Sequence, residues 1–197
     1  IYTKLLEYYG KQNWWPISYN FQPKEWEICI GAILTQNTNW NNVEKALSTL
    51  NQHTCITPDD VIKIKEEKLY NLIRSSGFYK KKTDRLKNLS KFISTFKTFE
   101  DFKKKVKRED LLGINGIGPE TADSILLYAC DRPYFVIDTY TKRLCNQLNI
   151  KIKEKPKYED YRGLFEENLP RDVKLYKEFH ALIVRCGKDK FKALNSI

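Results

Sequence analysis

The sequence lacks methionine and has only two histidines, and its cysteines follow no paired spacing. The five cysteines are Cys29, Cys55, Cys130, Cys145 and Cys186. An odd number at wide spacing indicates neither a disulfide framework nor a zinc site. No apolar run approaches the roughly 18 residues of a membrane helix, and no signal-peptide pattern opens the chain. We therefore expect an intracellular protein of the cytoplasm or nucleoid, with no membrane partner and with Cys29, Cys130 and Cys145 buried and reduced.

Positive charge is what the sequence has in excess. Lys and Arg number 35 against 25 Asp and Glu, which gives a formal net charge of +10 over 197 residues. Hydrophobic residues make up 41%, too many for a disordered basic tail and enough for one core or two lobes. A polyanion is therefore the first partner to consider. Two lysine clusters, Lys80–Lys82 and Lys103–Lys107, lie beside predicted turns, and a solvated helix end explains each alone equally well.

The residue pattern predicts an all-α protein. Strand-like alternation is scarce, and Gly and Pro separate segments of about 10–18 residues. Thr57 and Pro58, for example, are typical N-cap and N1 residues of a helix. The expected helices cover residues 1–9, 25–35, 42–50, 58–65, 67–73, 81–95, 99–107, 119–130, 138–148, 158–168 and 173–188.

The strongest local signal is a glycine-rich turn between two helical segments. It reads Leu111-Leu112-Gly113-Ile114-Asn115-Gly116-Ile117-Gly118-Pro119-Glu120-Thr121-Ala122. Glycines allow positive φ and a close approach of the backbone, and amides at a helix start favour an anion. Because the strand of a dinucleotide site and the Lys-Ser/Thr of a P-loop are missing, a nucleic-acid phosphate is the better candidate. A tight connection between two helices is the structural alternative.

A longer pattern resembles the helix–hairpin–helix DNA glycosylase superfamily, of the endonuclease III type. Gly116-Ile117-Gly118 is followed by an apolar helix and then by Arg132-Pro133-Tyr134-Phe135-Val136-Ile137-Asp138. The stretches Gly31–Thr38, Leu72–Lys82 and Phe179–Val184 resemble the same family, so the likeness spans nearly the whole chain. The resemblance implies one unit of two helical lobes with a DNA-binding cleft between them. The central lobe would cover about 25–135, with the helix–hairpin–helix motif at about 108–130, and the second lobe 1–24 and 136–197.

The resemblance also implies site residues. Asp138 would be the catalytic carboxylate that stabilises positive charge on the sugar and activates water, although it is also a plausible N-cap. Gln36 would fill the gap that a flipped-out nucleotide leaves. The expected DNA-binding residues are Gln36, Asn37, Phe78, Tyr79, Gly116, Ile117, Gly118 and Thr121. A monovalent cation, sodium or potassium, would be held by the carbonyls of Leu112, Ile114 and Ile117.

Two departures from the family pattern narrow the expected chemistry. Glu120 stands where bifunctional members have the lysine that forms a Schiff base, and a carboxylate cannot form an imine. Glu120 is equally a first-turn acid favoured by the helix dipole. The first cysteine of an iron–sulfur cluster would fall near Phe191, and the sequence ends six residues later without a cysteine. We therefore expect a monofunctional enzyme with no iron–sulfur cluster and no organic cofactor.

The tryptophans indicate which residues would form the pocket for the damaged base. Trp14-Trp15-Pro16 resembles the 3-methyladenine DNA glycosylase III branch of the family, although cluster-bearing members can carry a similar motif. Indole faces attract a cationic N-alkylated purine by stacking and cation–π contact, and ordinary core packing is the alternative. The expected pocket residues are Trp14, Trp15, Pro16, Trp40 and Lys188. His180 is interpreted as a structural histidine, and Tyr140 stands where many members have a histidine.

The expected function is base excision repair by a monomer bound to double-stranded DNA. The enzyme would flip out a damaged base, with an N-alkylated purine such as 3-methyladenine preferred, and hydrolyse its N-glycosidic bond. One alternative is an endonuclease III-like glycosylase for oxidised pyrimidines or mismatched bases. The other is a non-catalytic helix–hairpin–helix DNA-binding module.

Overall fold

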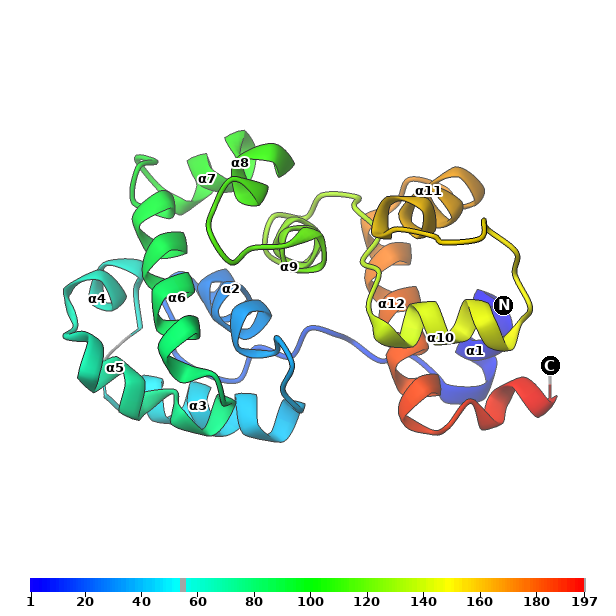
Figure 1. Cartoon of the computed structure of the whole chain (residues 1–197), viewed down its shortest axis with the longest axis horizontal. Coiled ribbons are helices and arrows are strands. Elements are labelled where there is room, and N and C mark those ends of the chain that lie inside the picture. The colour runs from blue at the N-terminus through cyan, green and yellow to red at the C-terminus, as the bar shows by residue number, and fades with distance from the viewer. Residues whose placement is uncertain (54–55, 197) are drawn as a thin grey trace. The chain divides into compact units, whose positions relative to one another are not determined.

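The computed structural model describes residues 1–53 and 56–196, so Cys55 lies outside it. All regular elements of the described residues are helical (Figure 1), which confirms the all-α prediction. The chain divides into two compact units. Unit 1 combines Ile1–Pro16 with the chain from Asp131 onward, and unit 2 is the continuous segment Ile17–Cys130. The expected cleft between two lobes stays a prediction.

Unit 2 is built around α2. Every residue of α2 from Trp26 to Leu34 is buried, and all of them except Glu27 have apolar or small side chains. It contacts α3, α6 and α9 (Figure 1). Burying each large aliphatic side chain contributes about 1.5–3 kcal/mol. The helices of unit 2 are α2 (Lys24–Leu34), α3 (Trp40–Gln52), α4 (Pro58–Lys63), α5 (Glu66–Leu72), η1 (Arg74–Ser76), α6 (Tyr79–Ile93), α7 (Phe99–Lys105), α8 (Arg108–Leu112), α9 (Pro119–Ser124) and the π-helical turn η2 (Ile125–Ala129).

The first residues of unit 2 are fastened to α2 through Glu27. This carboxylate is 1% exposed and accepts the backbone N–H groups of Ser18 and Tyr19, each at 3.0 Å. Burial raises the pKa of Glu27, and the two N–H donors oppose that shift. By compactness, residues 17–24 belong to unit 2, whereas the resemblance groups them with residues 1–16.

Unit 1 is organised by α12, whose apolar stripe faces α1 and α10 (Figure 1). An aromatic cluster lies beside it: the rings of Phe135 and Phe165 stack at 4.3 Å, and Tyr176 and Phe179 meet Phe135 edge-on. The helices of unit 1 are α1 (Tyr2–Tyr9), α10 (Thr139–Gln147), α11 (Tyr158–Asn168), α12 (Val173–Lys188) and η3 (Lys192–Ser196).

Several helix boundaries differ from the predicted ones and α8 was not predicted, and three of the differences have a clear local description. The expected helix 119–130 changes to π geometry after Ser124, where Cys130 N–H bonds Ile125 O at 3.1 Å. α3 starts at Trp40 because the Asn39 side chain caps it by accepting the Asn42 N–H at 3.1 Å. α6 starts at Tyr79, so the break before it consists of Gly77 and Phe78 only.

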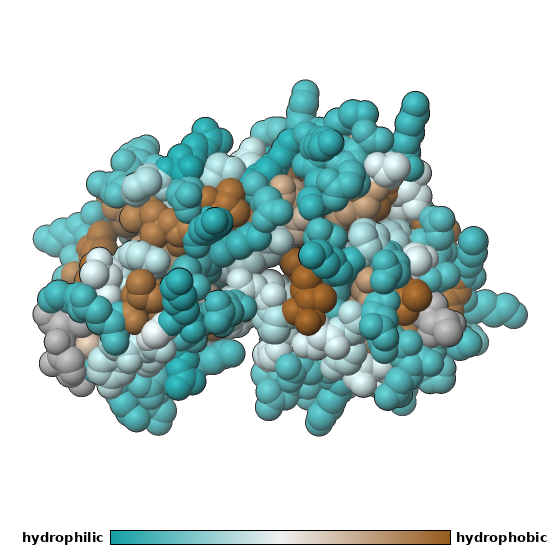
Figure 2. Space-filling model, turned by 180° about the vertical axis from the view of Figure 1, so that it is seen from behind, coloured by the Kyte–Doolittle hydropathy of each residue, from teal (hydrophilic) through white to brown (hydrophobic). Residues whose placement is uncertain are grey.

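The described cysteines are free and buried, as predicted for Cys29, Cys130 and Cys145, and Cys186 joins them. No helix in the described ranges is long and apolar enough to cross a membrane. The face shown in Figure 2 is mostly hydrophilic, with hydrophobic residues in separate patches.

Candidate functional site

The glycine-rich turn joins α8 to α9 as a hairpin in unit 2. Ile114 N–H bonds Leu111 O at 3.1 Å, and Ile117 N–H bonds Ile114 O at 3.0 Å. Gly116 has a positive φ of 89°, whereas Gly118 has an extended backbone with φ −92° and is the N-cap of α9. Of these two glycines, Gly116 uses the positive φ that glycine allows and Gly118 does not.

The two glycines also differ in what surrounds them. A Cβ added to Gly116 would lie 2.4 Å from Cγ of Arg85, so this glycine lets α6 approach the hairpin. A Cβ added to Gly118 would meet nothing within 4 Å. Gly118 is exposed while Ile117 and Thr121 are buried. The Gly118 end of the hairpin is therefore the part that a ligand could approach.

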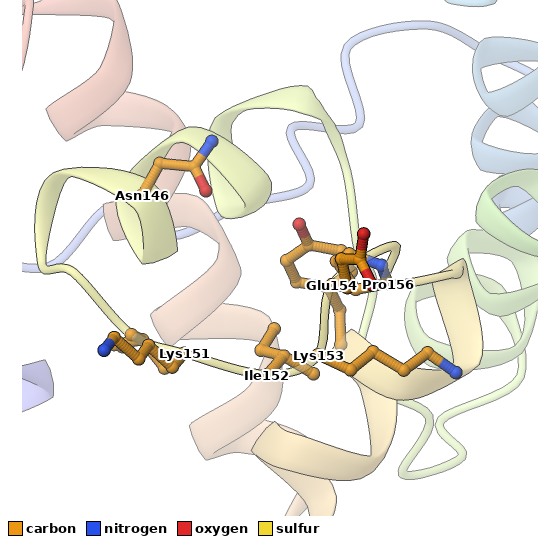
Figure 3. A pocket seen from close by; sticks show the side chains of 8 residues that line it. Asn146, Lys151, Ile152, Lys153, Glu154 and Pro156 are labelled. Atoms are coloured by element: carbon orange, nitrogen blue, oxygen red, sulfur yellow. The ribbon is translucent and has the colours of Figure 1, made fainter.

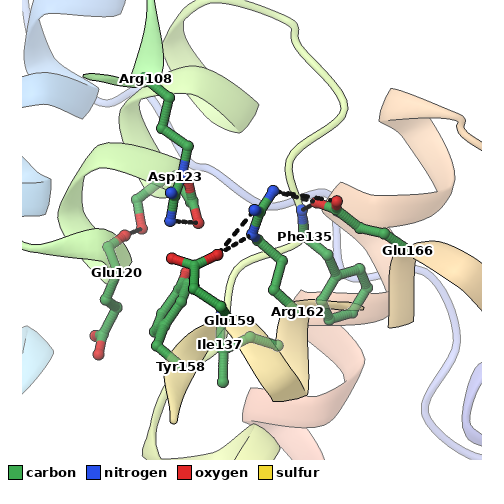
Figure 4. A network of polar contacts seen from close by, with 10 residues as sticks. Arg108, Glu120, Asp123, Phe135, Ile137, Tyr158, Glu159, Arg162 and Glu166 are labelled. Atoms are coloured by element: carbon green, nitrogen blue, oxygen red, sulfur yellow. Dashed lines mark hydrogen bonds and ion pairs between the residues drawn. The ribbon is translucent and has the colours of Figure 1, made fainter. Parts of the chain in front are cut away.

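An ion pair that the sequence did not indicate holds the hairpin helices together. Arg108 Nε and Nη2 donate to the two carboxylate oxygens of Asp123 at 2.6 and 3.1 Å (Figure 4). Both residues are buried, at 8% and 0% exposure. Removing one partner of such a pair costs about 3–5 kcal/mol because it leaves a buried charge. The pair therefore fixes α8 against α9.

Gln36 lies on the hairpin. Its amide Nε2 donates to Gly116 O at 3.1 Å and to the Thr121 hydroxyl at 2.9 Å, and its Oε1 accepts from Arg85. The structure thus brings three of the predicted DNA-binding residues together. Asn37 follows with an exposed side chain and a left-handed φ of 52°.

A solvated helix end, one of the two explanations for the Lys80–Lys82 cluster, does not hold for Lys82. This lysine is 0% exposed, and its Nζ donates to Leu34 O, Thr38 Oγ1 and Ser76 O, each at 2.7 Å. Burial, assisted by positive Arg85, lowers the pKa of Lys82 to about 8. The ammonium group therefore joins the loop that carries Gln36 to the turn before Phe78.

The signal for this burial was present in the sequence. Lys82 stands at the start of the apolar stripe of α6, which continues through Leu86, Leu89 and Ile93. Lys103, in the second lysine cluster, is also engaged, because its Nζ lies 3.1 Å from Glu25 and 3.3 Å from Glu100.

Phe78 and Tyr79 have different environments. Phe78 is 64% exposed and adopts a left-handed φ of 46°. Tyr79 is half-buried, with the Arg74 guanidinium 5.3 Å from its ring centre. Of the two predicted DNA contacts on this turn, Phe78 is the side chain presented to solvent.

Asp138 caps α10 in unit 1. Its Oδ1 accepts the Thr141 N–H at 2.7 Å and the Thr141 hydroxyl at 2.9 Å. The predicted cap is therefore confirmed. Oδ2 takes no part in these cap bonds and lies 3.8 Å from Nε2 of His180. Capping thus fixes the orientation of a carboxylate whose side chain is 16% exposed.

His180 is buried, as a structural histidine would be, and it also faces Asp138. Burial lowers the pKa of His180, and the negative Asp138 opposes that shift. Tyr140 lies against α12, since a Cβ on Gly187 would be 2.2 Å from its ring. Sequence reasoning had not connected His180 with the carboxylate.

The predicted base pocket is assembled in part. Lys188 Nζ lies 5.4 Å from the ring centre of Trp14, and Trp14 and Trp15 meet edge-on at 6.1 Å. Both tryptophans are half-buried, while Pro16 and Lys188 are exposed. Trp40, half-buried, is the first residue of α3 in unit 2. A pocket of all five residues therefore stays a prediction.

The remaining predicted positions lie on the hairpin. Leu112 ends α8, and Ile114 O already accepts one N–H, so a cation at these carbonyls and that of Ile117 stays a prediction. Among residues 1–53 and 56–196, no group of three or more His, Cys, Asp or Glu could hold a metal. Glu120 is exposed in the first turn of α9. A pocket beside α10, lined by Asn146, Lys151 and Lys153 among others, contains no predicted site residue (Figure 3).

Comparison with known proteins agrees with these features. Residues 30–171 match the family described as HhH-GPD superfamily base excision DNA repair protein. The chain is 49% identical over 195 residues to a Methanocaldococcus jannaschii protein named as a DNA repair glycosylase, covering 95% of this chain and 86% of that one. It is 29% identical over 172 residues to endonuclease III of Thermotoga maritima, covering 86% and 76%.

Solved structures give the same result. The crystal structure of the H. pylori 3-methyladenine DNA glycosylase bound to 1,N6-ethenoadenine matches with a TM-score of 0.78 and 33% identity, covering 95% of this chain and 93% of that one. A trapped covalent endonuclease III–DNA intermediate shares the fold, with a TM-score of 0.77 at 18% identity over 95% of this chain and 83% of that one. The family match covers the hairpin, Gln36 and Asp138, and these relatives extend it over nearly the whole chain. The chain belongs to the HhH-GPD superfamily of base excision DNA repair proteins.

Proposed function

We propose that this chain is a monomeric, monofunctional DNA glycosylase that hydrolyses the N-glycosidic bond of a damaged nucleotide in double-stranded DNA. The observation that carries the proposal is the fixed orientation of the Asp138 carboxylate. Its Oδ1 is fixed by Thr141, which leaves Oδ2 as the oxygen that can face a sugar and a water molecule. As the base leaves with the bonding electrons, this carboxylate stabilises the positive sugar and accepts a proton from the attacking water.

The hairpin and two loops of unit 2 would hold the DNA. The exposed Gly118 end suits a phosphate, and a cation at the carbonyls of Leu112, Ile114 and Ile117 would add positive charge there. Exposed Phe78 suits insertion into the base stack. Gln36 would fill the vacated position, for which its amide must leave Gly116 and Thr121.

An N-alkylated purine is the substrate class we propose. Support comes from Trp14 and Trp15, which belong to the same compact unit as Asp138, and from the 33% identity to a 3-methyladenine glycosylase bound to 1,N6-ethenoadenine. A positively charged base is already a good leaving group, so the site needs little general acid. Glu120 in place of an amine supports hydrolysis without lyase chemistry, and the proposal includes no iron–sulfur cluster.

The first test is base release by wild type and by Asp138→Asn. Asparagine can still cap α10, so the variant should keep its melting temperature and its DNA affinity while base release falls about 100-fold or more. DNA substrates should carry 3-methyladenine, 7-methylguanine, hypoxanthine, uracil or thymine glycol. Equal release by both proteins, or no release of any base by wild type, would reject the proposed role of Asp138.

Borohydride trapping on abasic DNA distinguishes the proposed monofunctional enzyme from the second candidate, an endonuclease III-like glycosylase. The 29% identity to an endonuclease III favours a glycosylase for oxidised pyrimidines. That enzyme would release thymine glycol, and a lyase would give a trapped covalent complex. We expect neither product from this chain.

A further inference from the structure

We propose that α11 positions the catalytic carboxylate, and that Tyr158 and Glu166 are its positioning residues. The inference rests on the proposed role of Asp138. It concerns the three residues before Asp138, which belong to neither a helix nor a strand. Their side chains, those of Phe135, Val136 and Ile137, are buried, so the backbone must satisfy its polar groups locally.

Two alternate N–H groups of this segment bond to α11 side chains. Phe135 N–H donates to Glu166 Oε1 at 2.9 Å, and Ile137 N–H donates to the Tyr158 hydroxyl at 3.2 Å. Figure 4 shows Glu166 reaching the backbone of Phe135 from the helix. The acceptors lie at residues 158 and 166, so they secure the segment to the two ends of one helix.

Glu166 is itself held in place. Arg162 Nη1 lies 3.1 Å from Glu166 Oε2, while Arg162 Nε and Nη2 each lie 2.8 Å from Glu159 Oε2 (Figure 4). The stacked rings of Phe135 and Phe165 add a second contact between the same two elements. The carboxylate that accepts the Phe135 N–H therefore has little freedom to move.

Hydrogen bonds to the residues before and after Asp138 in the sequence fix its position. Thr141 fixes its Oδ1 from the helix that follows, and Tyr158 fixes the residue that precedes it. Loss of the Ile137 bond would let the backbone shift one residue from the carboxylate. Because a misplacement of about 1 Å can cost about 100-fold in rate, a partial shift should be visible in kcat.

The pair Glu159 and Glu166 offers a matched comparison. Both carboxylates pair with Arg162, and the described bond to the 135–137 segment comes from Glu166. Glu166→Leu and Tyr158→Phe should each lower kcat for base release about tenfold, with the dissociation constant for abasic-analogue DNA unchanged. Glu166→Gln keeps an oxygen acceptor and should retain most of the activity. Glu159→Leu keeps the Arg162–Glu166 pair and the bond to Phe135 N–H, so it should lose much less activity than Glu166→Leu.

A second readout does not depend on activity. Amide hydrogen exchange in the full chain should accelerate at Ile137 in Tyr158→Phe and at Phe135 in Glu166→Leu, and stay unchanged at both in Glu159→Leu. Unchanged exchange at these amides, or an equal loss of kcat in Glu159→Leu, would overturn the inference. If wild type releases no base, the proposed function fails while the exchange experiment still decides whether α11 holds the segment.

Discussion

Lys188 and a cationic base would compete for the same indole. The Lys188 ammonium lies 5.4 Å from the ring centre of Trp14, on an exposed side chain at the end of α12. A positively charged purine stacked on this ring would meet a like charge, whereas a neutral lesion would not. If Trp14 stacks on the flipped-out base as proposed, Lys188 should therefore disfavour positively charged bases.

Replacing Lys188 by Gln should shift selectivity toward cationic bases. We expect the ratio of kcat/KM for 7-methylguanine over that for hypoxanthine to rise several-fold, since about 1 kcal/mol of repulsion corresponds to roughly fivefold. Competition assays on two oligonucleotides would measure the ratio. Lys190→Gln, close by in sequence and also exposed, is the control. An unchanged ratio in Lys188→Gln would show that Lys188 does not face the bound base.

Lys82 should make the free energy of unfolding depend on pH in the alkaline range. Its pKa is about 8 when folded and about 10.5 when unfolded, because burial disfavours its charge. Between these values the unfolded chain binds the proton more tightly. The contribution of Lys82 to the free energy of unfolding is therefore lowest below pH 8 and rises toward pH 10.5.

Urea unfolding of wild type and Lys82→Met from pH 7.5 to 10 tests this sign. The difference in unfolding free energy, wild type minus variant, should rise with pH by at most about 1.4 kcal/mol per pH unit. Lys81→Met changes an exposed neighbour and should give a flat difference. A flat result for Lys82→Met as well would mean that Lys82 titrates normally.

At the scale of elements, we expect the two glycines of the hairpin to have different roles, Gly116 in stability and Gly118 in DNA binding. Gly116 needs positive φ and faces Arg85, while Gly118 has ordinary φ and open space. Gly116→Ala should cost about 1–2 kcal/mol of stability. Gly118→Ala should leave the melting temperature nearly unchanged and weaken DNA binding, because a methyl group would stand where we propose that a DNA phosphate binds.

Thermal melts and DNA titrations of the two glycine variants would check this pair of outcomes. Full DNA affinity in Gly118→Ala would place the phosphate elsewhere. Reduced stability in both variants would instead show that the Gly118 end is packed in solution.

Prediction from sequence succeeded where the signal was local. The helix at 173–188 matches α12, because its apolar stripe is regular and Asp172 caps it. The π-helical turn at 125–129 could not be predicted, since an all-apolar Ile-Leu-Leu run has no pattern that distinguishes one hydrogen-bond register from another. The glycine turn at 113–118 was a local signal as well, whereas the catalytic role of Asp138 is implied by family resemblance. No sequence periodicity predicts the side-chain contacts Arg85–Gln36 and Arg108–Asp123, because their partners are 49 and 15 residues apart.

At the scale of the whole molecule, the net charge of +10 should supply most of the DNA affinity. Each neutralised phosphate contributes about −0.9 to the slope of log K against log salt concentration. Not every lysine can contribute, however. Lys81 is exposed beside the Phe78 turn, whereas Lys103 is paired with Glu25 at 3.1 Å.

Salt titrations can therefore separate DNA-binding lysines from structural ones. Lys81→Ala should reduce the steepness of the slope by about 0.9, and Lys103→Ala should leave the slope unchanged while lowering stability. Asp138→Asn should keep the wild-type slope. Equal slopes for wild type and Lys81→Ala would remove this lysine from the DNA-binding surface.

The division into units has a consequence for the order of assembly. Unit 2 is continuous, whereas unit 1 joins the first 16 residues to the chain after Cys130. During synthesis the whole of unit 2 is made before α10, α11 and α12, and domains generally fold as units from the N-terminus. The hairpin can form on a nascent chain, but α1 must wait for α12, which it contacts in the finished fold. The carboxylate that we propose for catalysis thus gains its surroundings only after α11 and α12 have been synthesised, later than the glycine turn.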